Sequence, residues 1–320
     1  MKDNYNDRGS DAVTAKKFMT FDQQINFLRD EKKLLIPDEK YARKTLKQIT
    51  YYSLFAGYKN IFKDPDTDLY KEGTSFNDIV GLYHFDEDLR SALLEYLFKI
   101  EDQIKTLVSY YFCEKFGPDQ SEYLNSKNYM ISSSSKVEID KMIHIFSNLA
   151  NKSTEYAAIN HARTKHKNVP LWVLVNSMTF GNIYKFYSYL TPDVKGKVAA
   201  AYPGINELEL EQFLALLTKF RNVCAHRERL FTHQTNKTIP DMPVHKRLLI
   251  PFNEDDQYKY GKNDLYAVVI SLYYLLPQDT FRDFKEKLSI LFSKYLHTEK
   301  VYPETEFLDI LGFPENWYEI

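Results

Sequence analysis

The sequence is short of glycine and cysteine, and each shortage argues against a class of protein. Ten glycines in 320 residues, beside 25 Tyr and 22 Phe, indicate helices packed through bulky side chains and not the glycine-rich turns of a sheet protein. The two cysteines, Cys113 and Cys224, form no CxxC pair. This argues against a disulfide framework and a cysteine-based zinc site, and it fits a reducing cytoplasm.

Long apolar runs and a large net charge are also lacking. The longest apolar stretch, "LYAVVISLYYLL" from Leu265, is shorter than the roughly 20 residues of a membrane-spanning helix, and we interpret it as a buried helix. The polar N-terminus has no apolar segment of a secretion signal, so we expect a cytoplasmic protein without a membrane partner. The net charge is −2, so any nucleic-acid site must be a local patch. Neither GxxxxGK[ST] nor GxGxxG occurs, and nucleotide hydrolysis has no support.

Apolar residues recur at helical spacing and almost never alternate, which predicts an all-α fold. Asp38 is expected to cap a helix that continues through Ile49 and Tyr52. Thr74 or Ser75 is expected to cap the next helix. A long helix then follows, ends at Gly117-Pro118, and carries one apolar face: Leu89, Leu93, Leu97, Ile100, Ile104, Leu107 and Val108.

Two further helices are predicted in the second half. Pro170 should open a helix through "LWVLVNSMTFGNIYKFYSYL", and another should cover "LELEQFLALLTKFRNVCAHRERLF". An apolar stripe is expected on the latter: Leu210, Phe213, Leu214, Leu217 and Cys224. Residues 232–262 are predicted to be a long connection. We expect a flexible tail at 1–17, an N-terminal helical segment at 18–74, and a helical core with C-terminal helices at 75–320.

The stretch "KFRNVCAHRERLF" holds the residues of greatest chemical interest. Arg221 and His226 are five positions apart, so on one helix they point about 140° away from each other. If the helix persists, Asn222, His226, Arg229 and His233 form one polar stripe at spacings of 4, 3 and 4. Asn222 would then hydrogen-bond a ring nitrogen of His226 and fix its tautomer.

The charge around this stretch predicts a polyanion site. From Lys219 to Arg247 there are seven Lys or Arg and three His against two acidic residues. A histidine and an arginine suit RNA cleavage by internal transesterification, in which the ribose 2′-OH attacks the adjacent phosphorus. Arg221 and His226 would converge if two copies of the helix met across a two-fold axis. A solvated polar face, with Arg221 at a helix–helix contact and His226 near a helix end, remains an open alternative.

Other polar residues have weaker interpretations. The cluster "HARTKHK" includes Arg163, Lys165 and Lys167, which would bind phosphates of an RNA or simply form a solvated helix end. Asp86, with its acidic neighbours, is expected to stabilise a helix N-terminus and not to bind metal. Glu101 is expected near the core, paired with a basic residue.

Cys224 is two residues from His226, and positions two apart do not face each other on a helix, so a thiol nucleophile is disfavoured. Arg227 and His233 form a looser Arg-x5-His pair, for which a primary catalytic role is disfavoured.

"RNVCAH" resembles the R-(N/D/H)-x-x-x-H signature of the HEPN ribonuclease superfamily. In longer context the chain resembles the Abi-like abortive-infection family of the AbiD/AbiF type over about residues 18–320. The resemblance rests on six blocks in order: "TFDQQINFLRDEKKLLIPDEKYARKTLKQITYYSLFAGY", "GTSFNDIVGLYHFDEDLR", "IEDQIKTLVSYYF", "VPLWVLVNSMTFGNIYKFY", "KFRNVCAHRERLF" and "LGFPENW".

The resemblance implies a bacterial phage-defence protein with a HEPN-like helical core that acts as a dimeric, metal-independent endoribonuclease without a cofactor. By position, it implies that Arg221 and His226 are catalytic and that Asn222 assists them. RNA is the expected partner, as substrate and as the inhibitory non-coding RNA found beside some relatives. Further RNA contacts are expected from the basic residues named above: Arg227, Arg229, His233, Arg163, Lys165 and Lys167.

Two positions depart from the family pattern. Arg227 replaces a second His that often follows the motif His, and Phe231 with Thr232 replaces an aromatic-Asn pair. A non-catalytic RNA-binding or scaffold protein that keeps the fold is therefore the alternative to an enzyme.

Overall fold

The structure is a computed structural model that describes residues 17–55, 57–132, 134–298 and 303–320. Within these ranges the chain is helical and has no β-strand, only isolated bridges such as the one between Leu35 and Ser75. The predicted all-α fold is therefore confirmed. Apart from its last residue, the predicted tail at 1–17 lies outside the described residues.

The chain divides into two compact units, residues 1–83 and 84–320, with the boundary inside the long helix α5. The predicted boundary at 74/75 falls just before that helix begins. The first unit holds α1 (Phe21–Asn26), a π-helix (Phe27–Glu31), α2 (Glu39–Gln48), α3 (Tyr51–Phe55), α4 (Lys59–Phe62) and the start of α5 (Phe76–Phe116).

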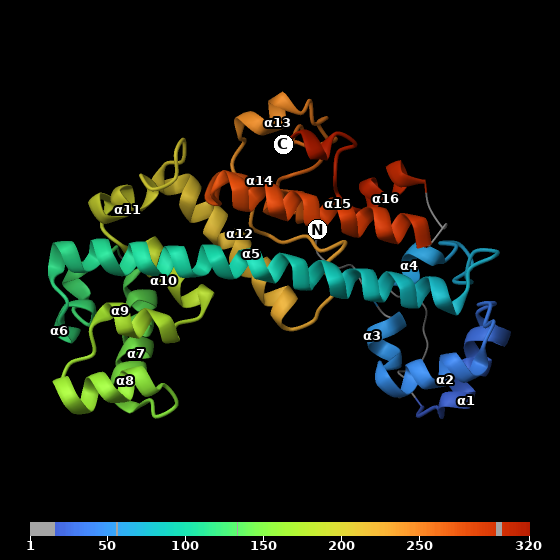
Figure 1. The fold of residues 1–320 in the computed structure, drawn as a ribbon, viewed down its shortest axis with the longest axis horizontal. Coiled ribbons are helices and arrows are strands. Elements are labelled where there is room, and N and C mark those ends of the chain that lie inside the picture. The colour runs from blue at the N-terminus through green and yellow to red at the C-terminus, as the bar shows by residue number, and fades with distance from the viewer. Residues whose placement is uncertain (1–16, 56, 133, 299–302) are drawn as a thin grey trace. The chain divides into compact units, whose positions relative to one another are not determined.

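The second unit holds the rest of α5 and the remaining helices (Figure 1). These are α6 (Gln120–Tyr123), a 3₁₀ turn (Ser126–Asn128), α7 (Lys136–Lys152), α8 (Ala157–His161), a π-helix (Ala162–His166), α9 (Leu171–Leu174), a 3₁₀ turn (Val175–Ser177), α10 (Phe180–Tyr189), α11 (Pro192–Ala199), α12 (Glu207–Ala225), α13 (Pro243–Arg247), α14 (Leu265–Leu275), α15 (Gln278–Thr298), α16 (Glu304–Leu311) and a final 3₁₀ turn (Trp317–Glu319).

The predicted cap at Asp38 is present, but the helix that follows is shorter than expected. The Asp38 carboxylate accepts hydrogen bonds from the backbone N–H groups of Lys40 and Tyr41, at 2.8 and 3.1 Å. The helix ends at Gln48 because Ile49 is extended. Thr50 then accepts a hydrogen bond from the Ser53 N–H at 3.1 Å, and so caps a separate helix, α3.

Helix α5 begins and ends where local signals place it. The Ser75 hydroxyl donates to Asp78 at 2.9 Å in the first turn, and Gly117, with a φ of 98°, follows the last helical residue. The predicted apolar face is buried except for Leu107, which is half-buried. The helix therefore forms one wall of the second unit's core.

Helix α12 runs through that core. It packs against α10, α11 and α14, and α14 packs against α15. The predicted stripe is buried, but so is the whole run from Phe213 to Thr218. The middle of α12 is thus covered on all sides, and both ends of the helix reach the surface.

Two segments differ from the prediction: one expected helix is broken, and one expected connection contains a helix. The helix expected from Pro170 is broken at Met178, which is extended, and Thr179 caps α10 by accepting from the Asn182 N–H at 3.2 Å. The long connection at 232–262 contains α13. Buried His245, on α13, contacts the Gly261 carbonyl through Nε2 at 2.8 Å and ties the connection to the start of α14.

Asp264 caps α14 from a fully enclosed position. Its carboxylate accepts hydrogen bonds from the Ala267 N–H at 2.9 Å and the Gly261 N–H at 3.0 Å. Burial nevertheless raises the pKa of Asp264 to about 6, and the backbone hydrogen bonds only partly oppose this.

Candidate functional site

The candidate site lies at the C-terminal end of α12. Asn206 and Glu209 start the helix with a capping box. The helix ends at Ala225: the Glu228 N–H donates to the Val223 carbonyl at 3.0 Å and the Arg227 N–H to the Cys224 carbonyl at 3.2 Å. Arg227 has a φ of 57°, the left-handed conformation that closes such a helix end.

The early end of α12 overturns the predicted polar stripe. His226 is the C-cap, so Arg229 and His233 lie beyond the helix and cannot continue the spacing of Asn222 and His226. The predicted side-chain hydrogen bond from Asn222 to the His226 ring is also not formed in the described residues. Only the backbone links the two, through His226 N–H and the Asn222 carbonyl at 2.9 Å. Both side chains are exposed.

Arg221 turns away from His226 and packs against α5. Its Nε lies 3.5 Å from Oε2 of Glu101, and its guanidinium carbon lies 5.8 Å from the centre of the Phe98 ring. The side chain is 23% exposed, and its buried nitrogen is Nε. Nη1 and Nη2 are bonded to no described residue, so the outer edge of the guanidinium is available to a ligand. As expected for this spacing, Arg221 and His226 do not meet within one chain.

Glu101 is buried and holds two cations. Its Oε1 forms an ion pair with Nζ of Lys105 at 2.8 Å, one turn along α5, while its Oε2 faces Arg221. The prediction of a near-core Glu101 paired with a basic residue is confirmed. Two cations facing one buried carboxylate compensate its charge and fix the Nε edge of Arg221.

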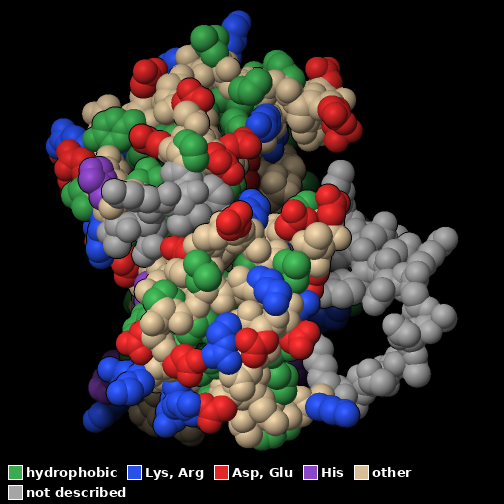
Figure 2. All heavy atoms as spheres, turned by 90° about the vertical axis from the view of Figure 1, so that its right-hand side faces the viewer, with side chains coloured by type: hydrophobic (Ala, Val, Ile, Leu, Met, Phe, Trp, Pro, Cys, Tyr) green, Lys and Arg blue, Asp and Glu red, His purple; other side chains and the backbone are tan. Residues whose placement is uncertain are grey.

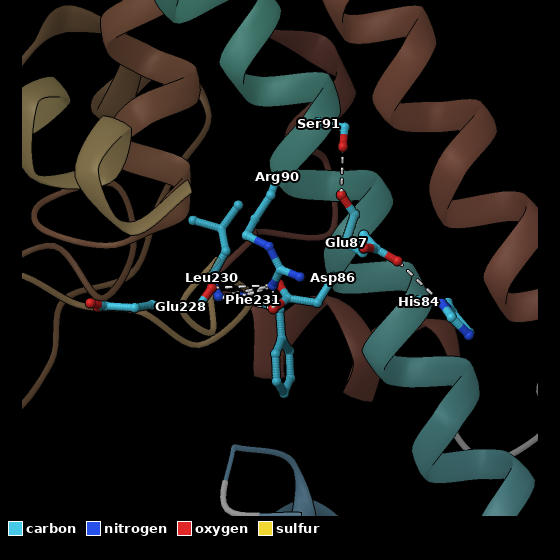
Figure 3. A network of polar contacts seen from close by, with 8 residues as sticks. All are labelled: His84, Asp86, Glu87, Arg90, Ser91, Glu228, Leu230 and Phe231. Carbon is cyan, nitrogen blue, oxygen red and sulfur yellow. Dashed lines mark hydrogen bonds and ion pairs between the residues drawn. The ribbon is translucent and has the colours of Figure 1, made fainter. Parts of the chain in front are cut away.

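A second buried carboxylate fastens the segment after α12 (Figure 3). Asp86 accepts hydrogen bonds from the N–H groups of Leu230 and Phe231, the shortest being 2.8 Å, and it is paired with Arg90. Arg90 also donates to the Glu228 carbonyl at 3.1 Å. Asp86 lies three turns inside α5, so the expectation that it stabilises a helix N-terminus is wrong. It anchors the 228–231 segment instead.

A shallow pocket of about 380 Å³ adjoins the end of α12. It is lined by Lys219, Asn222, Val223, Glu228, His233, Gln234, Thr235 and Asn236. The His233 ring meets Phe220 edge-on, with ring centres 5.1 Å apart. Burial lowers the pKa of His233 below its ordinary value, which favours the neutral imidazole.

Cys224 cannot serve as a nucleophile in this arrangement. It is buried, and burial, with the nearby Asp86 charge, raises the pKa of its thiol to about 12. The sequence interpretation of Cys224 as a small core residue is therefore confirmed.

The other predicted RNA contacts are differently placed. Arg227 and Arg229 are exposed just after α12. Arg163 is turned inward: its guanidinium donates to the carbonyls of Ala150 and Ser153, at 2.9 and 2.8 Å, at the end of α7. Arg163 therefore caps a helix, and we leave it out of the RNA surface. Lys165 and Lys167 are exposed on the segment that follows.

Charges elsewhere are mixed. On the face shown in Figure 2, Lys and Arg side chains alternate with Asp and Glu among the described residues. The described residues on this face therefore form no patch of one sign.

Several residues of the site were missed by sequence reasoning. The pairing of Lys105 with Glu101 could have been predicted, because the two residues are one helical turn apart, next to the apolar residues Ile100 and Ile104. No sequence pattern links three other residues to the site, since only the fold brings them to the end of α12: Phe98, Gln234 and Asn236.

In the described parts of the chain, no three His, Cys, Asp or Glu side chains are grouped as metal ligands would be. Among the helices that the structure describes, none has the length and hydropathy needed to cross a bilayer.

Comparison with known protein families gives a match. A sequence model described as "Abi-like protein" matches residues 44–232, which is more than half of the chain and includes Arg221, Asn222 and His226. No curated protein and no solved structure matches.

Proposed function

Because the chain belongs to the Abi-like protein family, we propose that it is an abortive-infection protein of antiphage defence that acts as a metal-independent endoribonuclease of the HEPN type. The observation that carries the proposal is the setting of Arg221. Its Nε edge faces buried Glu101, while its terminal nitrogens form no bond to any residue that the structure describes, at the end of the helix that also presents His226.

The proposed reaction is internal transesterification of RNA. His226 takes the proton of a ribose 2′-OH, whose oxygen attacks the adjacent phosphorus. The bond from phosphorus to the 5′-oxygen breaks, and a protonated imidazole returns a proton to that oxygen. Products are a 2′,3′-cyclic phosphate and a 5′-hydroxyl. The guanidinium of Arg221 stabilises the charge on the phosphoryl oxygens through two parallel hydrogen bonds.

Arg221 and His226 point away from each other within one chain, and a composite site in a homodimer would bring them together. Arg221 packs on α5 and His226 lies at the exposed helix end, so one chain does not bring them to one phosphate. Two copies related by a two-fold axis would place Arg221 of one beside His226 of the other, with Asn222 between them.

The basic residues outside the catalytic group bind the RNA backbone. Arg227 and Arg229 follow α12 directly, and Lys165 and Lys167 provide a separate exposed positive surface. Such contacts position a strand without reading its sequence. The same surfaces would hold an inhibitory non-coding RNA that keeps the protein dormant in the cytoplasm until infection.

Incubation of RNA-free protein with total RNA in EDTA tests the proposal. Cleavage ending in 2′,3′-cyclic phosphate is expected, and Arg221→Ala and His226→Ala should each reduce its rate by about 10²–10⁴. Arg282→Ala and His144→Ala are matched controls, because both side chains are exposed and lie outside the site. Both controls should cut like the wild type.

The rival function is a non-catalytic RNA-binding module, which the Arg at position 227 in place of a second His favours. Tight RNA binding by RNA-free wild type without any cleavage would establish that rival. Light scattering tests the dimer: a monomer that still cleaves RNA would refute the composite site.

A further inference from the structure

The pocket beside α12 lies on the His226 side of the helix. Lys219 and Asn222 line it, and His226 follows Asn222 by four positions, which places their side chains on one face. Arg221 is on the opposite side, against α5. A strand with a phosphate at His226 would therefore run close to this pocket, which Asn222 lines.

The walls of the pocket offer hydrogen bonds that the protein does not use. The side-chain amides of Asn222, Gln234 and Asn236 form no hydrogen bond within the described residues, and the Glu228 carboxylate forms no ion pair there. Amides match the donor and acceptor pairs on base edges. A carboxylate repels phosphate and accepts hydrogen bonds from an amino group. The pocket therefore suits a base better than a phosphate.

We propose that this pocket binds one unstacked nucleobase of the RNA strand next to the scissile phosphate, and that it selects bases with an exocyclic amino group. Glu228 accepts from that amino group, Asn222, Gln234 and Asn236 bond the remaining edge, and Lys219 meets a neighbouring phosphate. Uracil is disfavoured because its O4 is an acceptor where cytosine has the N4 amino donor. This inference rests on the proposed function.

The pocket is preformed on its Glu228 side. Arg90 fixes the Glu228 carbonyl, and Asp86 fixes the N–H groups of Leu230 and Phe231 (Figure 3). Because these contacts use only the backbone of residue 228, its carboxylate can be changed without touching the anchor. Glu228→Gln is therefore a substitution that tests recognition and spares the fold.

The experiment uses DNA oligonucleotides with a single ribonucleotide, which confines cleavage to one bond. The base is varied on either side of that bond, and cytosine is compared with uracil at each position. We expect one position at which cytosine is cut about tenfold faster than uracil. Glu228→Gln should bring that ratio close to one, because an amide can donate to O4 as well as accept from N4. Glu254→Gln, an exposed change outside the pocket, should keep the ratio.

Each outcome separates the pocket from the catalytic proposal. Equal cutting of cytosine and uracil on both sides, or a ratio unchanged in Glu228→Gln, overturns the base pocket while leaving the nuclease intact. If the wild type cleaves no substrate, the base pocket is tested by binding. Fluorescence anisotropy then compares the affinity for oligocytidine with that for oligouridine. Preference for oligocytidine that is lost in Glu228→Gln supports the pocket without catalysis, and equal or absent binding overturns it.

Discussion

Arg221 and Glu101 face each other from two helices, with Nε 3.5 Å from Oε2 and both atoms buried. The distance is that of an ion pair, yet neither atom has a hydrogen-bond partner among the described residues. The pair leaves the Nη atoms of Arg221 for a ligand. Glu101 is thus the natural positioning residue for this guanidinium.

Glu101→Gln should reduce RNA cleavage by about tenfold to a hundredfold, because an unpaired Arg221 is free to leave its orientation. Single-turnover kinetics with saturating RNA would measure the loss. Lys105→Gln is the matched comparison: it breaks the same buried cluster but leaves Glu101 to hold Arg221. If both variants lose stability equally and also lose cleavage equally, Glu101 has no positioning role.

Asp86→Asn should lower the free energy of unfolding by about 3–5 kcal/mol, since Arg90 would be left as a buried charge without its counter-ion. Urea denaturation would measure the change. Asp88→Asn, two residues along the same helix, should cost about 0–1 kcal/mol because that carboxylate is 53% exposed. Similar losses at both positions would contradict the anchoring role of Asp86.

The stability contribution of Asp264 should depend on pH. Its folded-state pKa of about 6 lies above the unfolded value near 3.9, so the folded protein binds the proton more tightly. This contribution is present below pH 4 and is lost as pH rises through 6. The free energy of unfolding of the wild type, minus that of Asp264→Asn, should therefore fall by about 2–3 kcal/mol between pH 4 and pH 7.

Urea titrations of both proteins at several pH values would measure that difference. The contributions of the other carboxylates to the pH dependence are the same in both proteins and cancel on subtraction. Asn at position 264 retains a side-chain oxygen for the cap, so the comparison isolates ionisation. A difference that stays flat, or rises with pH, would show that Asp264 is ionised across this range.

Local signals in the sequence predicted the parts of the fold that local chemistry decides. Asp38 caps α2, and Gly117 ends α5, because a carboxylate and a left-handed glycine act on their own helix. The end of α12 could not be predicted in this way. Arg227 adopts the left-handed conformation that glycine usually supplies, so no residue type marks the stop.

Long-range contacts limit how much of the candidate site can be predicted from the sequence. Arg221, Asn222 and His226 are predicted site residues because of their spacing and the family resemblance. The contact between Asp86 and the backbone at Leu230 joins residues 144 positions apart, and no periodicity in the chain encodes it. Arg163 was misjudged for a related reason, since a basic residue near a helix end looks the same whether it meets solvent or carbonyls.

Both anchors of the site come from α5: Asp86 holds the 228–231 segment, and Glu101 holds Arg221. Fifteen residues of one helix separate these two anchors, a rise of about 22 Å at 1.5 Å per residue. The number of helical turns between Asp86 and Glu101 therefore sets the distance between the two anchors. An inserted residue between Asp86 and Glu101 would rotate one anchor by about 100° relative to the other and lengthen their separation by about 1.5 Å, so the 228–231 segment and Arg221 could not both keep their contacts with α5.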